Sequence, residues 1–201
     1  MLPTSFDHPH PSRREPVFGD AVVATSQPLA AQAGLEMLAE GGTSVDAAIA
    51  TAAALTVTEP TSTGLGSDAF CLHWDAHRLH GFNGSGRSPA AFDSEGILAR
   101  GQIQTVGWEP VTIPGAIDAW FTLHERFGKL PMARLLEPAI RMAQDGFRVA
   151  PQTAYYWTKS AAKFGHLSGW TSTFTRDGRT PRPGEQVQLP EHALTLKTLA
   201  R

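Results

Sequence analysis

The feature that most constrains the fold is the stretch SVDAAIATAAALTVT at residues 44–58, which would carry small or apolar side chains on nearly every face of a helix. Such a helix gains nothing from facing water, so we expect other elements to cover it on most sides. Thr43 or Ser44 can cap its first turn, and Pro60 ends the segment. The sequence therefore predicts a buried helix with its neighbours packed around it.

A second helical pattern comes directly before this one. Ser26 is a candidate N-cap, Pro28 falls in the first turn, and Gly41 marks the C-terminal end. The apolar face carries Leu29, Ala33 and Met37. Gly34 costs the helix about 1 kcal/mol relative to alanine, so we expect close packing at that position. Because only a Gly-Gly pair separates the two patterns, they predict a tight helical hairpin.

Further along the chain, predicted strands and helices are segregated rather than alternating. Strands are predicted at 69–74 and 78–83, joined by a turn at 75–77, and also at 21–26, near 110–113 and within 173–187. Helices are predicted over 114–127, 131–146, 151–164 and from 189 onward, with a kink or restart at Pro138 in the second of these. This layout favours the α+β class over a doubly wound sheet.

The composition is that of a globular protein, with 41% hydrophobic and 18% charged residues in a chain of 201. The net charge of −2, from 17 basic and 19 acidic side chains, argues against a nucleic-acid or anionic-membrane partner. No stretch has the apolar length of a signal peptide or a membrane span, so we expect a cytoplasmic protein. Residues 1–16 show no periodic pattern and are predicted to form a flexible tail.

The sequence gives little support for a reactive thiol or a metal site. The single cysteine, Cys71, excludes an internal disulfide and a multi-thiolate metal site, and its apolar neighbours predict a buried, inert thiol. His73, His77 and His80 lie within one predicted hairpin, but no closely spaced carboxylates or thiolates complete a zinc site. We therefore interpret them as solvated histidines and expect no metal.

The loop EPTSTGLGSDAF, residues 59–70, poses the main functional question. A phosphate-binding loop would carry a third glycine or a Gly-Lys-Ser/Thr ending and would precede a helix, whereas this loop precedes a strand. A nucleophile elbow needs Gly-x-Ser-x-Gly at a strand-to-helix turn, and neither Ser67 nor Ser85 has that context. The spacing therefore favours glycines that allow positive φ and close backbone packing, with Asp68 in a capping or turn role.

Several stretches, taken in order, resemble the γ-glutamyltranspeptidase family. The first has a serine in a turn after a strand, a helix that ends in Gly-Gly, then VDAA, EP and a glycine-rich loop before a strand. It reads VVATSQPLAAQAGLEMLAEGGTSVDAAIATAAALTVTEPTSTGLGSDAFCLHWD. GRSPAAF, VTIPGAIDAWFTLHERFGKLP and LLEPAIRMAQDGFRVAP follow it in the family's order. The resemblance covers residues 19–201.

This resemblance implies an N-terminal nucleophile hydrolase, a four-layer αββα sandwich made as a proenzyme that cuts itself before a threonine. The new α-amino group of that threonine acts as the base for its own hydroxyl, and backbone N–H groups hold the oxyanion. A γ-glutamyl or related acyl group then passes from a small-molecule amide or peptide to water or an amine. The resemblance implies no cofactor, and it places residues 62–68 in a turn beneath the active-site cleft.

One departure from the family concerns the nucleophile. The family's catalytic threonine is followed by a histidine, and no Thr-His pair occurs here; the family's large subunit is also considerably longer. We therefore expect residues 17–201 to be an incomplete N-terminal part of that subunit, inactive alone and dependent on the remaining large- and small-subunit segments. The alternative is a non-catalytic truncated fragment that needs a partner chain to fold and associates through uncovered sheet edges.

A second departure concerns substrate binding. Transpeptidases hold the substrate α-carboxylate with an arginine four residues before the proline of an RExAP motif. Counting back from Pro89 reaches Ser85, whereas the arginine of NGSGRSP is Arg87. Arg87 is the first candidate for substrate binding, and Ser85 and Asn83 are weaker ones; alternatively, Arg87 is a solvated surface residue. Recognition of an α-amino carboxylate is thus open, and hydrolysis of another amide is possible.

Overall fold

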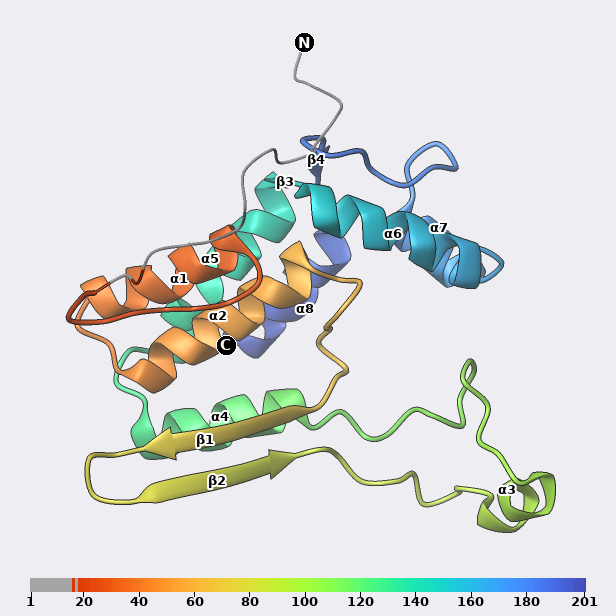
Figure 1. Cartoon of the computed structure of the whole chain (residues 1–201), viewed down its shortest axis with the longest axis horizontal. Helices are drawn as coiled ribbons and strands as arrows, with labels where there is room; N and C mark the ends of the chain where they lie inside the picture. The colour runs from red at the N-terminus through yellow and green to blue at the C-terminus, as the bar shows by residue number, and fades with distance from the viewer. Residues whose placement is uncertain (1–15, 17) are drawn as a thin grey trace.

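The computed structural model describes residue 16 and residues 18–201, so the predicted tail at 1–16 lies almost wholly outside the described residues. Figure 1 shows a group of helices above a β-hairpin, with a helix-bearing segment extending to one side. In chain order the elements are α1 (Pro28–Ala39), α2 (Ser44–Thr58), β1 (Ala69–Trp74), β2 (Leu79–Gly84), α3 (Ser94–Arg100), α4 (Ala116–Phe127), α5 (Met132–Asp145), β3 (Phe147–Arg148), α6 (Pro151–Phe164), α7 (Ser168–Phe174), β4 (Gln186–Val187) and α8 (Pro190–Leu199). Both strand pairs, β1–β2 and β3–β4, are antiparallel, and the α+β prediction is confirmed.

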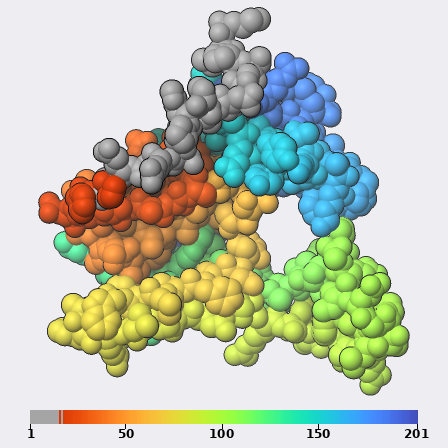
Figure 2. Space-filling model, in the orientation of Figure 1, coloured from red at the N-terminus to blue at the C-terminus, as the bar shows by residue number. Residues whose placement is uncertain are grey.

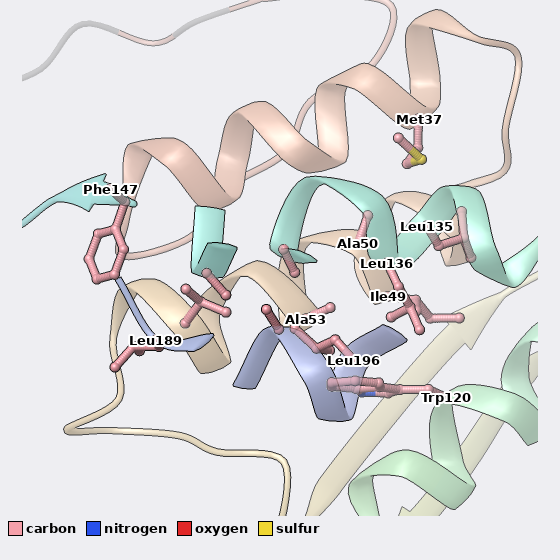
Figure 3. Close-up of a cluster of buried hydrophobic side chains, with 14 of the residues drawn as sticks. Met37, Ile49, Ala50, Ala53, Trp120, Leu135, Leu136, Phe147, Leu189 and Leu196 are labelled. Atoms are coloured by element: carbon pink, nitrogen blue, oxygen red, sulfur yellow. The ribbon is translucent and has the colours of Figure 1, made fainter. Parts of the chain in front are cut away.

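The helix α2 lies in the middle of the core, as its composition predicts. It packs against α1, α4 and α5, and α8 packs against α5. Most of its buried side chains are small, so the neighbouring backbones can approach it closely. Larger side chains from the surrounding elements fill the space around it (Figure 3): Met37, Trp120, Leu135, Leu136, Phe147, Leu189 and Leu196. The predicted helical hairpin and its buried second helix are both confirmed.

Gly34 allows α1 to lie close to α2. A Cβ atom at this position would be 2.3 Å from the Oγ1 of Thr51 and 3.1 Å from the carbonyl oxygen of Ala47. Thr51 is buried, and its hydroxyl has no hydrogen-bond partner among the described residues. Any side chain at position 34 would therefore push the two helices apart, which confirms the close packing predicted from this glycine.

The carboxylate of Asp46 joins the start of α2 to the connection between α4 and α5. It is fully buried and accepts a hydrogen bond from the N–H of Thr43 at 2.8 Å, while the Thr43 hydroxyl accepts one from the N–H of Asp46 at 3.2 Å. The same carboxylate accepts hydrogen bonds from the N–H groups of Lys129 and Leu130, at 3.1 and 3.3 Å. Because a buried charge is tolerated only when it is well hydrogen-bonded, this joint needs all of its donors.

The hairpin of β1 and β2 has two different faces. Its register pairs Cys71 with Phe82 and Leu72 with Gly81, within one residue of the predicted strands. Alternate side chains, among them Cys71 and Phe82, pack against the helical core, where α4 contacts both strands. The opposite face, called here the outer face, exposes Phe70, Leu72, Trp74 and Leu79. One side of the hairpin is thus part of the core, and the other is apolar but uncovered in this chain.

Two predicted strands are wrong. Residues 21–26 form no strand. The stretch 110–113 makes one backbone hydrogen bond to a distant segment, from the Ile113 N–H to the Arg87 carbonyl at 2.9 Å. A strand requires a ladder of such bonds with a neighbour, and neither apolar stretch has one. The short elements α3, α7 and β3 were not predicted, because each is too short to show a clear period.

Two local predictions about helices also need correction. The N-cap of α1 is Gln27, whose side-chain oxygen accepts hydrogen bonds from the N–H groups of Leu29 and Ala30. Ser26 instead donates its hydroxyl hydrogen to the Glu59 carboxylate at 2.7 Å. Helix α5 runs through Pro138 as one helix that packs against α2 and α8, so the predicted restart is wrong, while a kink at this proline stays a prediction. None of the described helices is both long and apolar enough to cross a membrane.

We expect Asp46→Asn to destabilise the chain. The Asp46 carboxylate accepts hydrogen bonds from the N–H groups of Thr43, Lys129 and Leu130, and an amide cannot accept all of them because its N–H₂ group would face these donors. The free energy of unfolding should fall by about 1 to 3 kcal/mol. Urea unfolding followed by circular dichroism measures this, with Asp145→Asn, an exposed carboxylate at the end of α5, as the matched control. Equal stability of the Asp46→Asn and control variants would contradict the role of this joint.

Candidate functional site

The three candidate residues lie where the chain leaves the hairpin. The Oδ1 of Asn83 accepts a hydrogen bond from the Ser85 N–H at 3.0 Å, which turns the backbone at the end of β2. Asn83 and Arg87 are exposed, and Ser85 is partly buried. Within the part of the chain that the structure describes, the Arg87 guanidinium takes part in no ion pair. The structure therefore places the three residues together, Asn83 at the end of β2 and Ser85 and Arg87 directly after it, with the arginine open to an anion. This segment is called here the 83–87 loop.

The start of α4 lies directly against the 83–87 loop. Gly115, the N-cap of α4, is buried and packs on the backbone of Gly84 and Gly86. One residue later, the Ala116 N–H donates to the Ser67 carbonyl at 2.9 Å. The first turn of α4 thus holds two loops that are distant in sequence. Gly115 was not among the residues predicted from the sequence. The sequence feature that points to it is the Pro-Gly pair immediately before an amphipathic helix, which marks a helix start.

The glycine-rich loop consists of two consecutive turns. The Ser62 N–H donates to the Glu59 carbonyl, and the Ser67 N–H and hydroxyl both donate to the Gly64 carbonyl, at 3.1 and 2.6 Å. Neither Gly64 nor Gly66 has positive φ, and a Cβ atom on either would meet nothing within 4 Å. The prediction that these glycines serve positive φ or close packing is therefore wrong for this chain, because their surroundings are open.

Asp68 also departs from its predicted role. The residue is exposed between the second turn and β1, and its carboxylate accepts no hydrogen bond from any described residue. The turn before it is closed by the Ser67 hydroxyl instead. The lone carboxylate is thus left free at the surface, without a base or a cation paired to it among the described side chains.

Figure 2 shows an opening on this side of the molecule. It is bordered by the segment that leads from α2 to β1, by α6 and α7, and by residues 88–113, which extend outward and include α3. Shallow hollows lie along the same border, where Thr61 and Ser62 face Tyr156 and Phe164 of α6. The beginning of the glycine-rich loop therefore borders a concave face of this chain, and the place of residues 62–68 beneath an active-site cleft stays a prediction.

Two of the hairpin histidines, His73 and His80, belong to a packing cluster. His80 is buried, and its Nε2 lies 2.6 Å from the Asp75 carboxylate. This contact, with backbone N–H donors from Arg78 and His77, holds the pKa of Asp75 well below its usual range. Among the described residues, no three His, Cys, Asp or Glu side chains are grouped as metal ligands.

The predicted solvated state of the histidines is correct only for His77. His80 and His73 both pack against the ring of Phe127 on α4, with ring centroids 4.9 and 4.4 Å apart. The Arg126 guanidinium lies over the same aromatic group, 5.1 Å from the Phe127 centroid. This cluster fastens the turn end of the hairpin to α4, on the side away from the 83–87 loop. Cys71 is only partly buried on the same face of the hairpin, and this burial raises the pKa of its thiol; an inert thiol stays a prediction.

A separate hollow of about 630 Å³ lies between α6, α7 and the start of α8. Trp157 and Phe174 form its apolar wall, and the Arg179–Glu185 ion pair lies at its edge. That pairing lowers the pKa of Glu185 to about 2, and burial lowers the pKa of His192. None of the residues of the 83–87 loop lines this hollow, so the structure does not join it to the candidate site.

Comparison with known proteins supplies the family. The sequence matches the γ-glutamyltranspeptidase family over residues 30–201. The chain therefore belongs to the γ-glutamyltranspeptidase family, and the expected resemblance is confirmed.

The chain is similar to proteins named as acylases and to one named as glutathione hydrolase-like. A cephalosporin acylase from Bacillus halodurans shares 46% identity with a TM-score of 0.87, covering 100% of this chain and 39% of the acylase. The glutathione hydrolase-like YwrD proenzyme of Bacillus subtilis is 35% identical over 182 residues, 89% of this chain and 35% of that protein. The acylase ACY 1 proenzyme of Pseudomonas sp. (strain V22) is 32% identical, covering 93% of this chain and 36% of that protein.

The predicted N-terminal nucleophile hydrolase fold is confirmed by this structural agreement. The chain spans about a third of the length of the curated relatives it matches, 35% and 36% of the two proenzymes. Its helical layer and its hairpin are therefore compared with only part of each relative.

Proposed function

We propose that the full-length protein hydrolyses an amide or transfers its acyl group, and that this chain forms part of the substrate-binding scaffold. The observation that carries the proposal is the agreement of the whole chain with an acylase, at 46% identity and a TM-score of 0.87. Relatives named glutathione hydrolase and acylase both match, so a γ-glutamyl amide and another acyl amide are the two substrate classes to consider.

In this proposal the nucleophile is an N-terminal threonine that lies outside these residues. The sequence contains no Thr-His pair, and both curated relatives are named proenzymes. The threonine hydroxyl attacks the amide carbonyl while its own α-amino group takes the hydroxyl proton and passes it to the leaving amine. Water or a second amine then cleaves the ester and releases the acyl group. The described residues bind and orient the substrate in this scheme.

The 83–87 loop would recognise the acyl donor. Arg87 is exposed and has no ion-pair partner among the described side chains, so its planar guanidinium can bind a carboxylate of the donor through two parallel hydrogen bonds. Ser85 and Asn83 lie in the same turn and can add hydrogen bonds to the same group. Because Ser85 stands where transpeptidases have their arginine, an acyl group without an α-amino carboxylate fits the proposal equally well.

Joining this chain to the family's missing segments tests the proposed function. We expect the precursor to cut itself into two chains, visible as two bands on a denaturing gel, because the new α-amino group is the base that the threonine needs. The product should then release aniline from a γ-glutamyl anilide or from a glutaryl anilide, and the faster of the two assigns the acyl group. A precursor that stays intact and turns over neither anilide would refute the proposal.

Substitution of Arg87 in that enzyme tests the substrate-binding role. Arg87→Ala removes a charge-assisted pair of hydrogen bonds to the carboxylate of the acyl donor. KM for the preferred anilide should therefore rise about tenfold or more. Arg87→Lys should recover part of this effect, because lysine keeps the charge but not the planar fork. Arg182→Ala, another exposed arginine, serves as the control. If Arg87→Ala leaves KM at the control value, Arg87 is a surface residue.

The outer face of the hairpin favours a second reading, in which the chain cannot function without partner segments. Phe70, Leu72 and Trp74 are 69%, 77% and 61% exposed on adjacent outward positions of β1. Four large apolar side chains, counting Leu79, make a patch of the kind that marks an interface. We propose that the remaining segments of the family fold cover this face.

We expect the isolated chain of 201 residues to associate in solution through the outer face. Leu72→Lys should shift the sedimentation profile toward monomer, because it places a charge at the centre of the patch. Leu98→Lys alters an equally exposed leucine on α3, away from the hairpin, and should leave association unchanged. A monodisperse wild-type monomer with a sharp, cooperative melt would contradict the need for partner segments.

A further inference from the structure

We propose that Gly115 is a positioning residue for the acyl-donor site. By leaving room for the backbone of residues 84–86, it sets where the 83–87 loop lies relative to the glycine-rich loop. This inference rests on the proposed function, in which the 83–87 loop binds the substrate, and it assigns a role to a residue that does not touch the substrate itself.

Backbone atoms fill the space that a side chain at position 115 would need. A Cβ atom on Gly115 would lie 2.2 Å from the carbonyl oxygen of Gly84 and 2.6 Å from the amide nitrogen of Gly86. Contact with the tip of a flexible side chain would be relieved by rotation, but these obstacles are main-chain atoms. A side chain at position 115 therefore displaces the loop or the helix start as a unit.

The opposing residues are restricted in the same way. A Cβ atom on Gly84 would lie 2.8 Å from the Cβ of Ala119 and 3.0 Å from the carbonyl oxygen of Gly115. Gly86 has φ of +69°, and a Cβ atom there would lie 1.9 Å from the carbonyl oxygen of Ile113. The helix start and the 83–87 loop thus meet mainly through main-chain atoms, with the Ala119 methyl group beside Gly84, so there is no room for a side chain at any of the three glycines.

Two hydrogen bonds extend the contact in opposite directions. The Ile113 N–H donates to the Arg87 carbonyl at 2.9 Å, which ties the far end of the 83–87 loop to the same helix start. The Ala116 N–H donates to the Ser67 carbonyl at 2.9 Å, which ties in the glycine-rich loop. One short stretch, residues 113–116, therefore determines the distance between the 83–87 loop and the glycine-rich loop. A shift of about 1 Å in such a distance is enough to reduce catalysis about a hundredfold.

The test compares Gly115→Ala with Gly169→Ala in the full-length, self-cleaving enzyme. Gly169 lies at the start of α7, where a Cβ atom would meet nothing within 4 Å, so it controls for a Gly-to-Ala change at a helix start. Self-cleavage reports folding, and steady-state turnover of the preferred anilide reports the site. For Gly115→Ala we expect wild-type self-cleavage, a KM raised about tenfold, and a kcat within about threefold of wild type.

A double variant separates positioning from a general loss of structure. If Gly115 acts through the 83–87 loop, the increase in KM caused by Gly115→Ala should largely disappear in an Arg87→Ala background, because the contact that it positions is already gone. Hydrogen exchange gives a readout without activity: the Ser85 and Ile113 amides should exchange faster in Gly115→Ala, while those of α1 and α2 stay protected.

Each outcome decides the inference. Unchanged KM in a self-cleaved Gly115→Ala enzyme overturns it, and so does a KM increase that persists fully in the Arg87→Ala background. If Gly115→Ala does not self-cleave, Gly84→Ala replaces it, because a Cβ atom on Gly84 overlaps less with its neighbours. KM should then rise about threefold. Failure of both variants to self-cleave would show a purely structural role and overturn the inference. A wild-type enzyme that turns over neither anilide would refute the proposed function itself, whatever the result for Gly115.

Discussion

The buried carboxylate of Asp46 is the interaction on which the rest of this structure depends. It closes the capping box of α2 and at the same time accepts hydrogen bonds from the connection that ends α4 and begins α5. The Lys129 ammonium completes the joint by donating to the Gly41 carbonyl at 2.6 Å. Because each of these bonds has a backbone group on at least one side, the two connections are held in one position relative to each other.

The helix α4 carries this constraint from the core to the candidate site. Its C-terminal end is fixed at the Asp46 joint, and its last turn receives the hairpin through the Phe127 cluster. Its N-terminal end holds the 83–87 loop and the glycine-rich loop through Gly115 and Ala116. A single helix thus connects the helical core with the 83–87 loop at the surface. Loops held on a rigid scaffold in this way are common positions for binding residues.

The parts of the fold with strong local signals were predictable, and those that depend on distant partners were not. The buried α2, the Gly34 contact and the hairpin register follow from composition, a glycine in a helix, and alternation of side chains. The stretches 21–26 and 110–113 are apolar enough for strands, but neither has a neighbouring strand to pair with among the described residues. Gln27 takes the capping role from Ser26 because Glu59, thirty-three residues away, binds the serine hydroxyl.

The candidate site divides in the same manner. The sequence alone determined that Asn83, Ser85 and Arg87 belong to one loop, that the chain belongs with the γ-glutamyltranspeptidases, and that Gly64 and Gly66 stand before a strand. Only the tertiary structure decided that the start of α4 holds that loop, that His80 is buried beside Asp75, and that the surroundings of the two glycines are open. The reason is physical. Turn and helix preferences act over a few residues and are written locally. Backbone contacts such as that of Gly115 with Gly84 arise only when elements thirty residues apart are packed against the same core.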